Sequence, residues 1–219
     1  MLFLLLNIPL LYLYHSRKDV FELKTLFAIW GVYLVFGIVF FLEFQNSYLK
    51  INYQYQTLKG IAVPLVFLTI AFKILTVNNF KSNYSTERFL LMVLIAMTYS
   101  SLIKFTSQHF NRNETTHLFS STGFDLVNYI VICFWAPFTE ELFFRGYLFE
   151  KINSTSVFLF VSTLSFGSIH LFFYPMSSIL WLLLLGVALG AVRLIFKNLY
   201  SSIVFHSIYN IIVSSNFIN

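Results

Sequence analysis

The feature that most constrains this chain is a series of apolar runs that are long enough to cross a lipid bilayer. A bilayer core of about 30 Å takes roughly 20 consecutive apolar residues in a helix. Such runs recur along the sequence at residues 1–14 (short or tilted), 26–44, 61–77, 89–105, 124–151, 157–173, 178–196 and 199–215. The sequence therefore predicts an all-α, polytopic membrane bundle of about eight transmembrane helices.

The composition supports a multi-pass integral membrane protein whose first partner is the lipid bilayer. Only 11% of the 219 residues are charged, whereas a soluble domain carries about 25%. The net charge of +5 comes from lysines and arginines in short loops, which is typical of membrane topology and gives no reason to expect nucleic acid. The single cysteine, Cys133, excludes an internal disulfide framework. Abundant Phe, Ile, Tyr and Asn favour an AT-rich bacterial source, and so a bacterial cell membrane.

Three charged residues interrupt the fifth run, where charge is expensive. Glu140, Glu141 and Arg145 follow Pro137, which should kink the helix just before the acids. Each charge at the centre of a membrane helix costs about 2.5–3.5 kcal/mol. Glu141 and Arg145 are spaced i, i+4 and should pair, whereas Glu140 lies about 100° around the helix with a free carboxylate. The alternative interpretation is a helix end whose charges meet headgroups and water.

Two later spans carry histidines at helical spacing from other side chains. Phe166 and His170 share one helix face, and so do His206 and Asn210. Polar residues in membrane helices often serve only as interhelical hydrogen-bonding groups. Convergence on one wet pocket would lower the cost of all of them, and would join a general base, imidazoles and an amide. That set is suited to attack of water on an acyl carbon, and therefore to peptide hydrolysis.

These three motifs, in this order, resemble those of a known family. Glu140-Glu141-x-x-x-Arg145, Phe166-x-x-x-His170 and His206-x-x-x-Asn210 are similar to the motifs of the CPBP family. This family comprises CAAX prenyl proteases and bacteriocin-processing intramembrane proteases, and its members are also called Abi proteins. The resemblance covers the last four spans, so we expect a catalytic core at residues 123–219. Residues 1–122 would be N-terminal transmembrane helices, and nothing is carried over to them.

The resemblance implies roles for individual residues. Glu140 would activate the attacking water with the help of His170, and His206 and Asn210 would bind the oxyanion. The residues that would shape the site are Glu141, Arg145 and Phe166. Members of the family have been described as metal-dependent, although a glutamate-activated water needs no metal.

We expect no obligatory metal, but a divalent ion such as zinc remains an open alternative. The sequence has no HExxH pair on one helix. Glu140, His170 and His206 could still supply three ligands and leave one position open, as catalytic zinc requires.

The expected function is intramembrane endopeptidase activity on a membrane-associated peptide or protein. The substrate could be a prenylated CAAX-type C-terminus or a bacteriocin-type leader. A non-catalytic bacteriocin self-immunity protein or membrane scaffold is the main alternative. An ion- or proton-coupled transporter is less favoured, because the halves show no matched pair of Gly/Pro-interrupted spans.

Overall fold

The computed structural model describes residues 2–17, 19, 21–49, 85–110, 129–171, 174 and 176–214. Throughout these residues the regular structure is helical, which confirms the predicted all-α class. The elements are α1 (Leu2–Ser16), α2 (Leu23–Leu49), α4 (Thr86–Phe110), η2 (Val131–Trp135), α6 (Ala136–Glu141), η3 (Leu142–Tyr147), α7 (Leu148–Lys151), α8 (Thr155–His170), η4 (Met176–Ser178), α9 (Ile179–Phe196) and α10 (Leu199–Ser214). The span expected at 61–77 lies outside the described residues.

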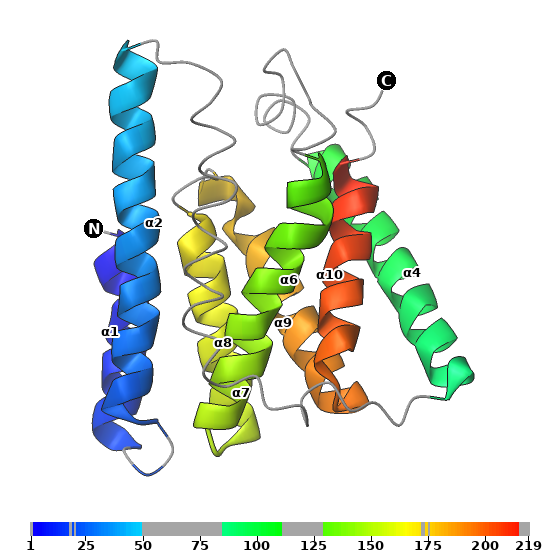
Figure 1. The fold of residues 1–219 in the computed structure, drawn as a ribbon, viewed down its shortest axis with the longest axis horizontal. Coiled ribbons are helices and arrows are strands. Elements are labelled where there is room, and N and C mark those ends of the chain that lie inside the picture. The colour runs from blue at the N-terminus through cyan, green and yellow to red at the C-terminus, as the bar shows by residue number, and fades with distance from the viewer. Residues whose placement is uncertain are drawn as a thin grey trace.

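The helices stand side by side, with the three sequence motifs at the centre of the bundle (Figure 1). α1 and α2 form one flank and α4 forms the opposite flank. The path η2–α6–η3–α7, together with α8, α9 and α10, fills the middle. α10 packs against both α6 and α4, and α8 packs against α9. This arrangement brings residues from the fifth, sixth and last predicted spans next to each other.

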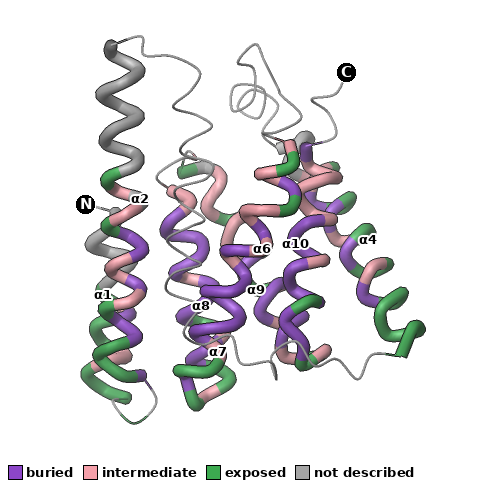
Figure 2. Tube along the Cα trace, in the orientation of Figure 1, coloured by how far each residue is buried: buried purple, intermediate pink, exposed green. Residues whose placement is uncertain are grey.

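Burial is concentrated in the central helices, whereas the flanks expose apolar side chains. Figure 2 shows buried segments facing one another in α6, α8, α9 and α10. α4 instead exposes a row of large apolar side chains, among them Leu90 at 60%, Leu94 at 59% and Phe105 at 71%. An apolar face of this extent is typical of a surface that contacts lipid rather than water. We infer that the outer face of α4 lies against the bilayer.

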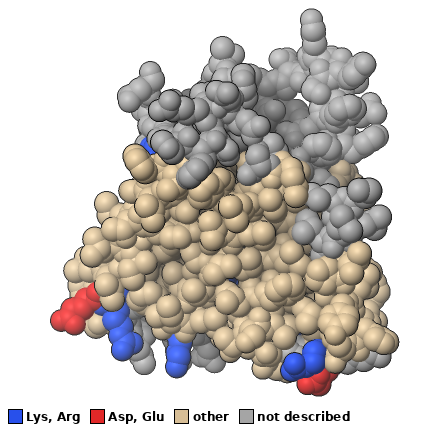
Figure 3. Space-filling model, turned by 180° about the vertical axis from the view of Figure 1, so that it is seen from behind, with Lys and Arg blue, Asp and Glu red and all other residues tan. Residues whose placement is uncertain are grey.

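Two described helical segments are long and apolar enough to cross a membrane, Thr86–Thr106 and Ile179–Phe196. Three shorter apolar helical segments, at Leu23–Val35, Thr155–His170 and Leu199–Ser214, accompany them. On the face seen in Figure 3, nearly all charged side chains of the described residues gather along the lower edge, and the broad middle is uncharged. This distribution fits a membrane bundle, while the predicted number of about eight spans stays a prediction.

The helix that carries the paired acids changes its hydrogen-bonding pattern twice. η2 and η3 are π-helical and enclose the six α-helical residues of α6. At the first change, the N–H of Ala136 donates to the carbonyl of Val131, five residues earlier. Turns of this kind are rare and are frequent at functional sites. The path continues across Pro137, and the kink expected there stays a prediction.

The glycines of α9 allow it to approach α8 closely. A Cβ added to Gly186 would lie 3.1 Å from Cγ2 and 3.2 Å from Cα of Thr163. A Cβ on Gly190 would meet the side chain of Leu159 at 2.5 Å. Small residues spaced four apart permit such helix contacts in membranes. The Gly186–Gly190 pair therefore lets α9 reach the back of the site.

Candidate active site

Glu141 is the centre of a buried network that joins two helices. Its Oε1 accepts a hydrogen bond from Nη1 of Arg145 at 3.1 Å. The same oxygen accepts a second bond from Nδ1 of His206 at 3.0 Å. Glu141 and Arg145 are fully buried, and the His206 side chain is 3% exposed. The expected i, i+4 pair is therefore present, and it also anchors α10.

Glu140 points away from this network and faces the other histidine. Its Oε2 lies 3.8 Å from Nε2 of His170. The two side chains keep 13% and 16% of their surface exposed, unlike the sealed Glu141 network. Adjacent acids thus occupy two different environments, as their 100° separation on a helix predicts. Within this pair of acids, Glu140 is the one whose side chain keeps exposed surface.

The hydrogen bonds of the two histidines set the orientation of their rings. Nδ1 of His170 lies 2.8 Å from the carbonyl oxygen of Phe166, which can only accept, so this nitrogen carries the proton. The Nε2 that faces Glu140 is then the basic nitrogen of a neutral ring. Nδ1 of His206 likewise donates to a carboxylate, which leaves its Nε2 for other partners. Nε2 of His170 therefore faces Glu140, and Nε2 of His206 is the ring nitrogen that is not bonded to Glu141.

The ring of Phe166 lies between the two halves of the site. It is 4.4 Å from the ring of His170 and 5.6 Å from that of His206, measured between centroids. The guanidinium carbon of Arg145 lies 4.7 Å from the same centroid, a distance at which a cation is attracted to an aromatic face. Phe166 thus contacts both histidines and Arg145, and the site-shaping role expected for it stays a prediction.

Asn210 also bonds to the helical path that carries the paired acids, but it does so through a backbone carbonyl. Its Nδ2 donates to the carbonyl of Ile132 at 2.8 Å. Local backbone geometry explains why this carbonyl needs a donor. Ala136, four residues on, donates to Val131 instead, and Pro137, five residues on, has no N–H. One amide hydrogen of Asn210 is therefore engaged by backbone, and its second N–H is a further donor.

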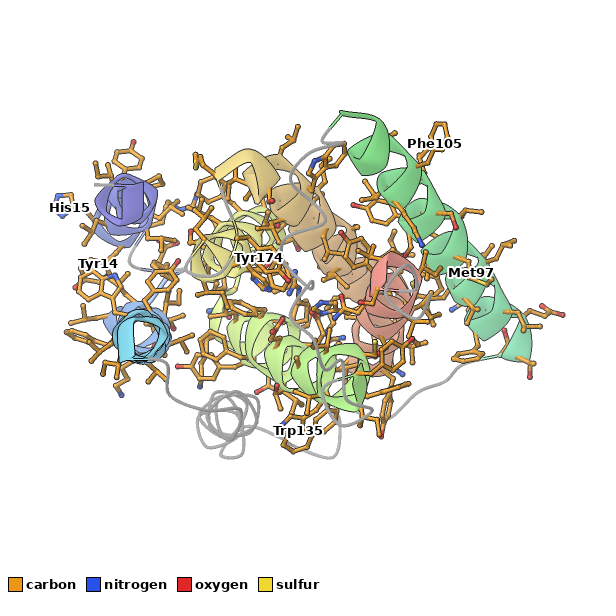
Figure 4. The ribbon with its side chains drawn as sticks, turned by 90° about the horizontal axis from the view of Figure 1, so that it is seen from above. Tyr14, His15, Met97, Phe105, Trp135 and Tyr174 are labelled. Carbon is orange, nitrogen blue, oxygen red and sulfur yellow. The ribbon has the colours of Figure 1, made fainter. Side chains whose placement is uncertain are left out.

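Three groups that the sequence did not predict also belong to this region. Nη2 of Arg145 donates to the carbonyl of Gly186 at 3.0 Å, and Nε of Arg193 donates to the carbonyl of Arg145 at 3.0 Å. Tyr174 lies 5.9 Å from the ring of His170, and Figure 4 shows it inside the circle of helices. Arg193 could have been noticed as a charge near the end of an apolar run. Its bond to Arg145 and the bond of Arg145 to Gly186 do not follow from spacing within one helix.

The proposed metal ligands do not form a metal site. Within the described ranges, no group of three His, Cys, Asp or Glu side chains is arranged to hold a metal ion. Nδ1 of His206 is bonded to Glu141, and Nδ1 of His170 is bonded to a backbone carbonyl. These bonds leave Nε2 of each ring for other partners, but within the described residues Glu140, His170 and His206 do not make up the three-ligand group of a catalytic zinc site.

A pocket elsewhere in the bundle is separate from these residues. It has a volume of about 410 Å³ and lies between the first turns of α4 and α10, with Phe89, Met92, Tyr200 and Val204 in its wall. None of the predicted site residues lines it. The chemistry-bearing groups are thus packed among helices rather than placed around this pocket.

Comparison with known proteins finds a family match for the region that carries these residues. Residues 122–212 match the model of the family described as type II CAAX prenyl endopeptidase Rce1-like. A search of curated proteins and a search of solved structures each found no match. The matched segment includes all three motifs and extends from before η2 to residue 212 in α10. Members of the family are intramembrane peptidases and integral membrane proteins. Over these residues the chain is therefore similar to the Rce1-like family of type II CAAX prenyl endopeptidases.

Proposed function

We propose that this protein is an intramembrane endopeptidase in which Glu140 activates a water molecule for attack on a peptide carbonyl. The observation that carries the proposal is the facing pair of Glu140 and His170, which is partly exposed beside a sealed network. The substrate is a membrane-associated peptide or protein. A prenylated CAAX-type C-terminus fits the family best, and a bacteriocin-type leader is the second substrate class.

The distance within this pair suits an intervening water. Oε2 of Glu140 and Nε2 of His170 are 3.8 Å apart, beyond the roughly 2.7–3.2 Å of a direct N–H···O bond. A water about 2.8 Å from each atom, to one side of the line between them, can bridge the two. Glu140 takes one proton from this water, and the resulting hydroxide attacks the carbonyl carbon. His170 accepts a hydrogen bond from the water through Nε2 and holds its lone pair toward the substrate.

The negative charge that develops on the substrate oxygen needs donors. Nε2 of His206 can donate only when the ring is doubly protonated, and Glu141 then provides its counter-charge at 3.0 Å. Asn210 contributes the N–H that is not bonded to Ile132. A single donor of this kind is worth about 10²–10³ in kcat in other hydrolases. The proton held by Glu140 then passes to the leaving amine, which completes the hydrolysis.

The proposal is tested with purified protein in lipid nanodiscs and two labelled peptides, one prenylated with a CAAX terminus and one a bacteriocin-type leader. Wild type is expected to cleave at least one of them. Glu140→Gln should lower kcat by about 10²–10⁴, the usual contribution of a general base. Glu87→Gln, an exposed acid in the first turn of α4, is the matched control and should retain wild-type cleavage.

Full cleavage by Glu140→Gln would reject the proposal. A wild type that cleaves neither peptide, while His170→Ala and His206→Ala cells keep their resistance to a bacteriocin, would favour a non-catalytic immunity protein. Uptake of ions by proteoliposomes that disappears in Glu140→Gln would instead indicate transport.

A further inference from the structure

α9 contributes none of the predicted site residues, yet two of its groups hold Arg145 from the same side. The carbonyl of Gly186 accepts from Nη2 of Arg145, and Nε of Arg193 donates to the backbone carbonyl of Arg145, each at 3.0 Å. Gly186 and Arg193 are seven residues apart, which is about two helical turns. One face of α9 thus hydrogen-bonds to both the side chain and the main chain of Arg145.

Arg193 is buried where an arginine is costly. It is 3% exposed and lies in the last turn of α9. Its guanidinium carbon lies 4.2 Å from the ring centroid of Phe149, a cation–π contact that partly offsets the loss of water. A charged group in an apolar helix generally has a functional or structural reason. The bond to Arg145 supplies a specific reason here.

The carbonyl that Arg193 contacts belongs to the π-helical segment η3. π-helical turns use i→i+5 hydrogen bonds and are inserted singly into α-helices, where the regular pattern would otherwise continue. A charge-assisted hydrogen bond from outside the helix, roughly twice as strong as a neutral one, can hold the backbone in this form. Arg193 therefore acts on the turn that sets the direction of the Arg145 side chain.

The direction of that side chain matters because Arg145 continues the network to His206. Nη1 of Arg145 and Nδ1 of His206 share one oxygen, Oε1 of Glu141. A shift of Arg145 therefore changes the position of the carboxylate that orients the imidazole. We propose that Arg193 is a positioning residue that fixes the His206 ring through Arg145 and Glu141. The kinetic consequence rests on the proposed peptidase function, but the ring orientation does not.

Arg193→Met removes the donor and the charge and keeps an unbranched apolar side chain. It should lower kcat about 10- to 100-fold with KM within about twofold, because small misplacements far from the reacting atoms have effects of that size. Arg193→Lys keeps the charge near the Arg145 carbonyl and should recover part of the loss. Arg88→Met removes an exposed arginine in the first turn of α4 and is the matched control, with unchanged kcat.

The second measurement is independent of catalysis. Protein with ¹⁵N-labelled histidine is examined by NMR in nanodiscs, and His206→Ala identifies the His206 signals. In Arg193→Met the Nδ1 and Nε2 signals of His206 should shift or broaden, while those of the exposed His15 stay fixed. Arg193→Lys should restore the wild-type positions in part, and Arg88→Met should leave them unchanged.

The outcomes separate the two proposals. Unchanged His206 signals in folded Arg193→Met would overturn the positioning role, whatever the cleavage assay shows. Shifted His206 signals in Arg193→Met, together with a wild type that cleaves no peptide, would support the positioning role and count against the peptidase. A stability loss shared by Arg193→Met and Arg193→Lys, with His206 signals unmoved in both, would assign Arg193 to packing alone and overturn the inference.

Discussion

His206 hydrogen-bonds through Nδ1 to Oε1 of Glu141, a residue 65 positions earlier, at 3.0 Å. The preceding residue, Glu140, faces His170 instead. Consecutive acids thus belong to two structurally distinct sets, one sealed and multiply bonded, the other partly exposed and free of short hydrogen bonds among the described residues. This division leads to different expectations for the two glutamates.

Replacing Glu141 should damage the fold much more than replacing Glu140. Glu141→Gln leaves the buried Arg145 without its counter-charge, and breaking a buried pair costs about 3–5 kcal/mol. Glu140→Gln should change stability by less than about 1 kcal/mol, because its carboxylate is partly exposed and makes no ion pair shorter than 3.8 Å with His170. Unfolding by SDS titration in mixed micelles measures both. Equal losses for the two variants would contradict the division.

Asn210 should lose its structural importance when Pro137 is replaced. Asn210→Ala leaves the Ile132 carbonyl without its donor and should cost about 1–3 kcal/mol. In a Pro137→Ala background, residue 137 regains an N–H five positions after Ile132, so the cost of Asn210→Ala should fall by at least half. The free energies of unfolding of the four proteins form a double-mutant cycle. Identical costs in both backgrounds would show that the proline does not create the need for Asn210.

Gly186→Ala should destabilise the bundle by about 1–3 kcal/mol, the usual effect of overpacking. The new methyl group would approach the backbone of Thr163, which cannot rotate away, and would strain the carbonyl that Arg145 contacts. Gly31→Ala is the control, because a Cβ at that position of α2 meets no atom within 4 Å. That variant should be neutral, or more stable by up to about 1 kcal/mol through helix propensity. Thermal unfolding in nanodiscs distinguishes the two.

Removal of divalent metal should leave peptide cleavage within about twofold of its starting rate. The expectation follows from the arrangement of Glu140, His170 and His206, which does not bring together the three ligands of a catalytic zinc site. The assay compares protein before and after dialysis against EDTA and 1,10-phenanthroline. Loss of activity that added zinc restores, and added magnesium does not, would contradict the prediction.

The parts of the site that sequence could predict are those set by one helix alone. The Glu141–Arg145 pair follows from i, i+4 spacing, and the separate direction of Glu140 follows from the 100° step. The all-α class follows from the apolar runs. The resemblance to a CAAX protease family follows from the order of three motifs, and the match over residues 122–212 confirms that resemblance. The division at residues 122 and 123 and the catalytic roles stay predictions.

The parts that sequence could not predict depend on how helices rotate against one another. The sequence of the last span does not predict that His206 bonds to Glu141, because this contact depends on the orientation of α10 relative to α6. The Arg193 bond similarly requires the position of α9. For the Asn210 contact, Pro137 shows in the sequence that one backbone N–H is missing. The sequence does not show the π-helical turn that leaves the Ile132 carbonyl without a backbone donor.

The two π-helical turns around α6 determine where this helix can tolerate a change in length. A turn of this kind amounts to one extra residue accommodated in an otherwise regular helix, and its loss would rotate everything beyond it by about 100°. The short stretch Ala136–Glu141 is therefore insulated on both sides. A residue gained or lost at η2 or η3 can be absorbed there, because a π-helical turn can convert to an α-helical one. A change of length within the six residues between them would turn both acids away from their partners.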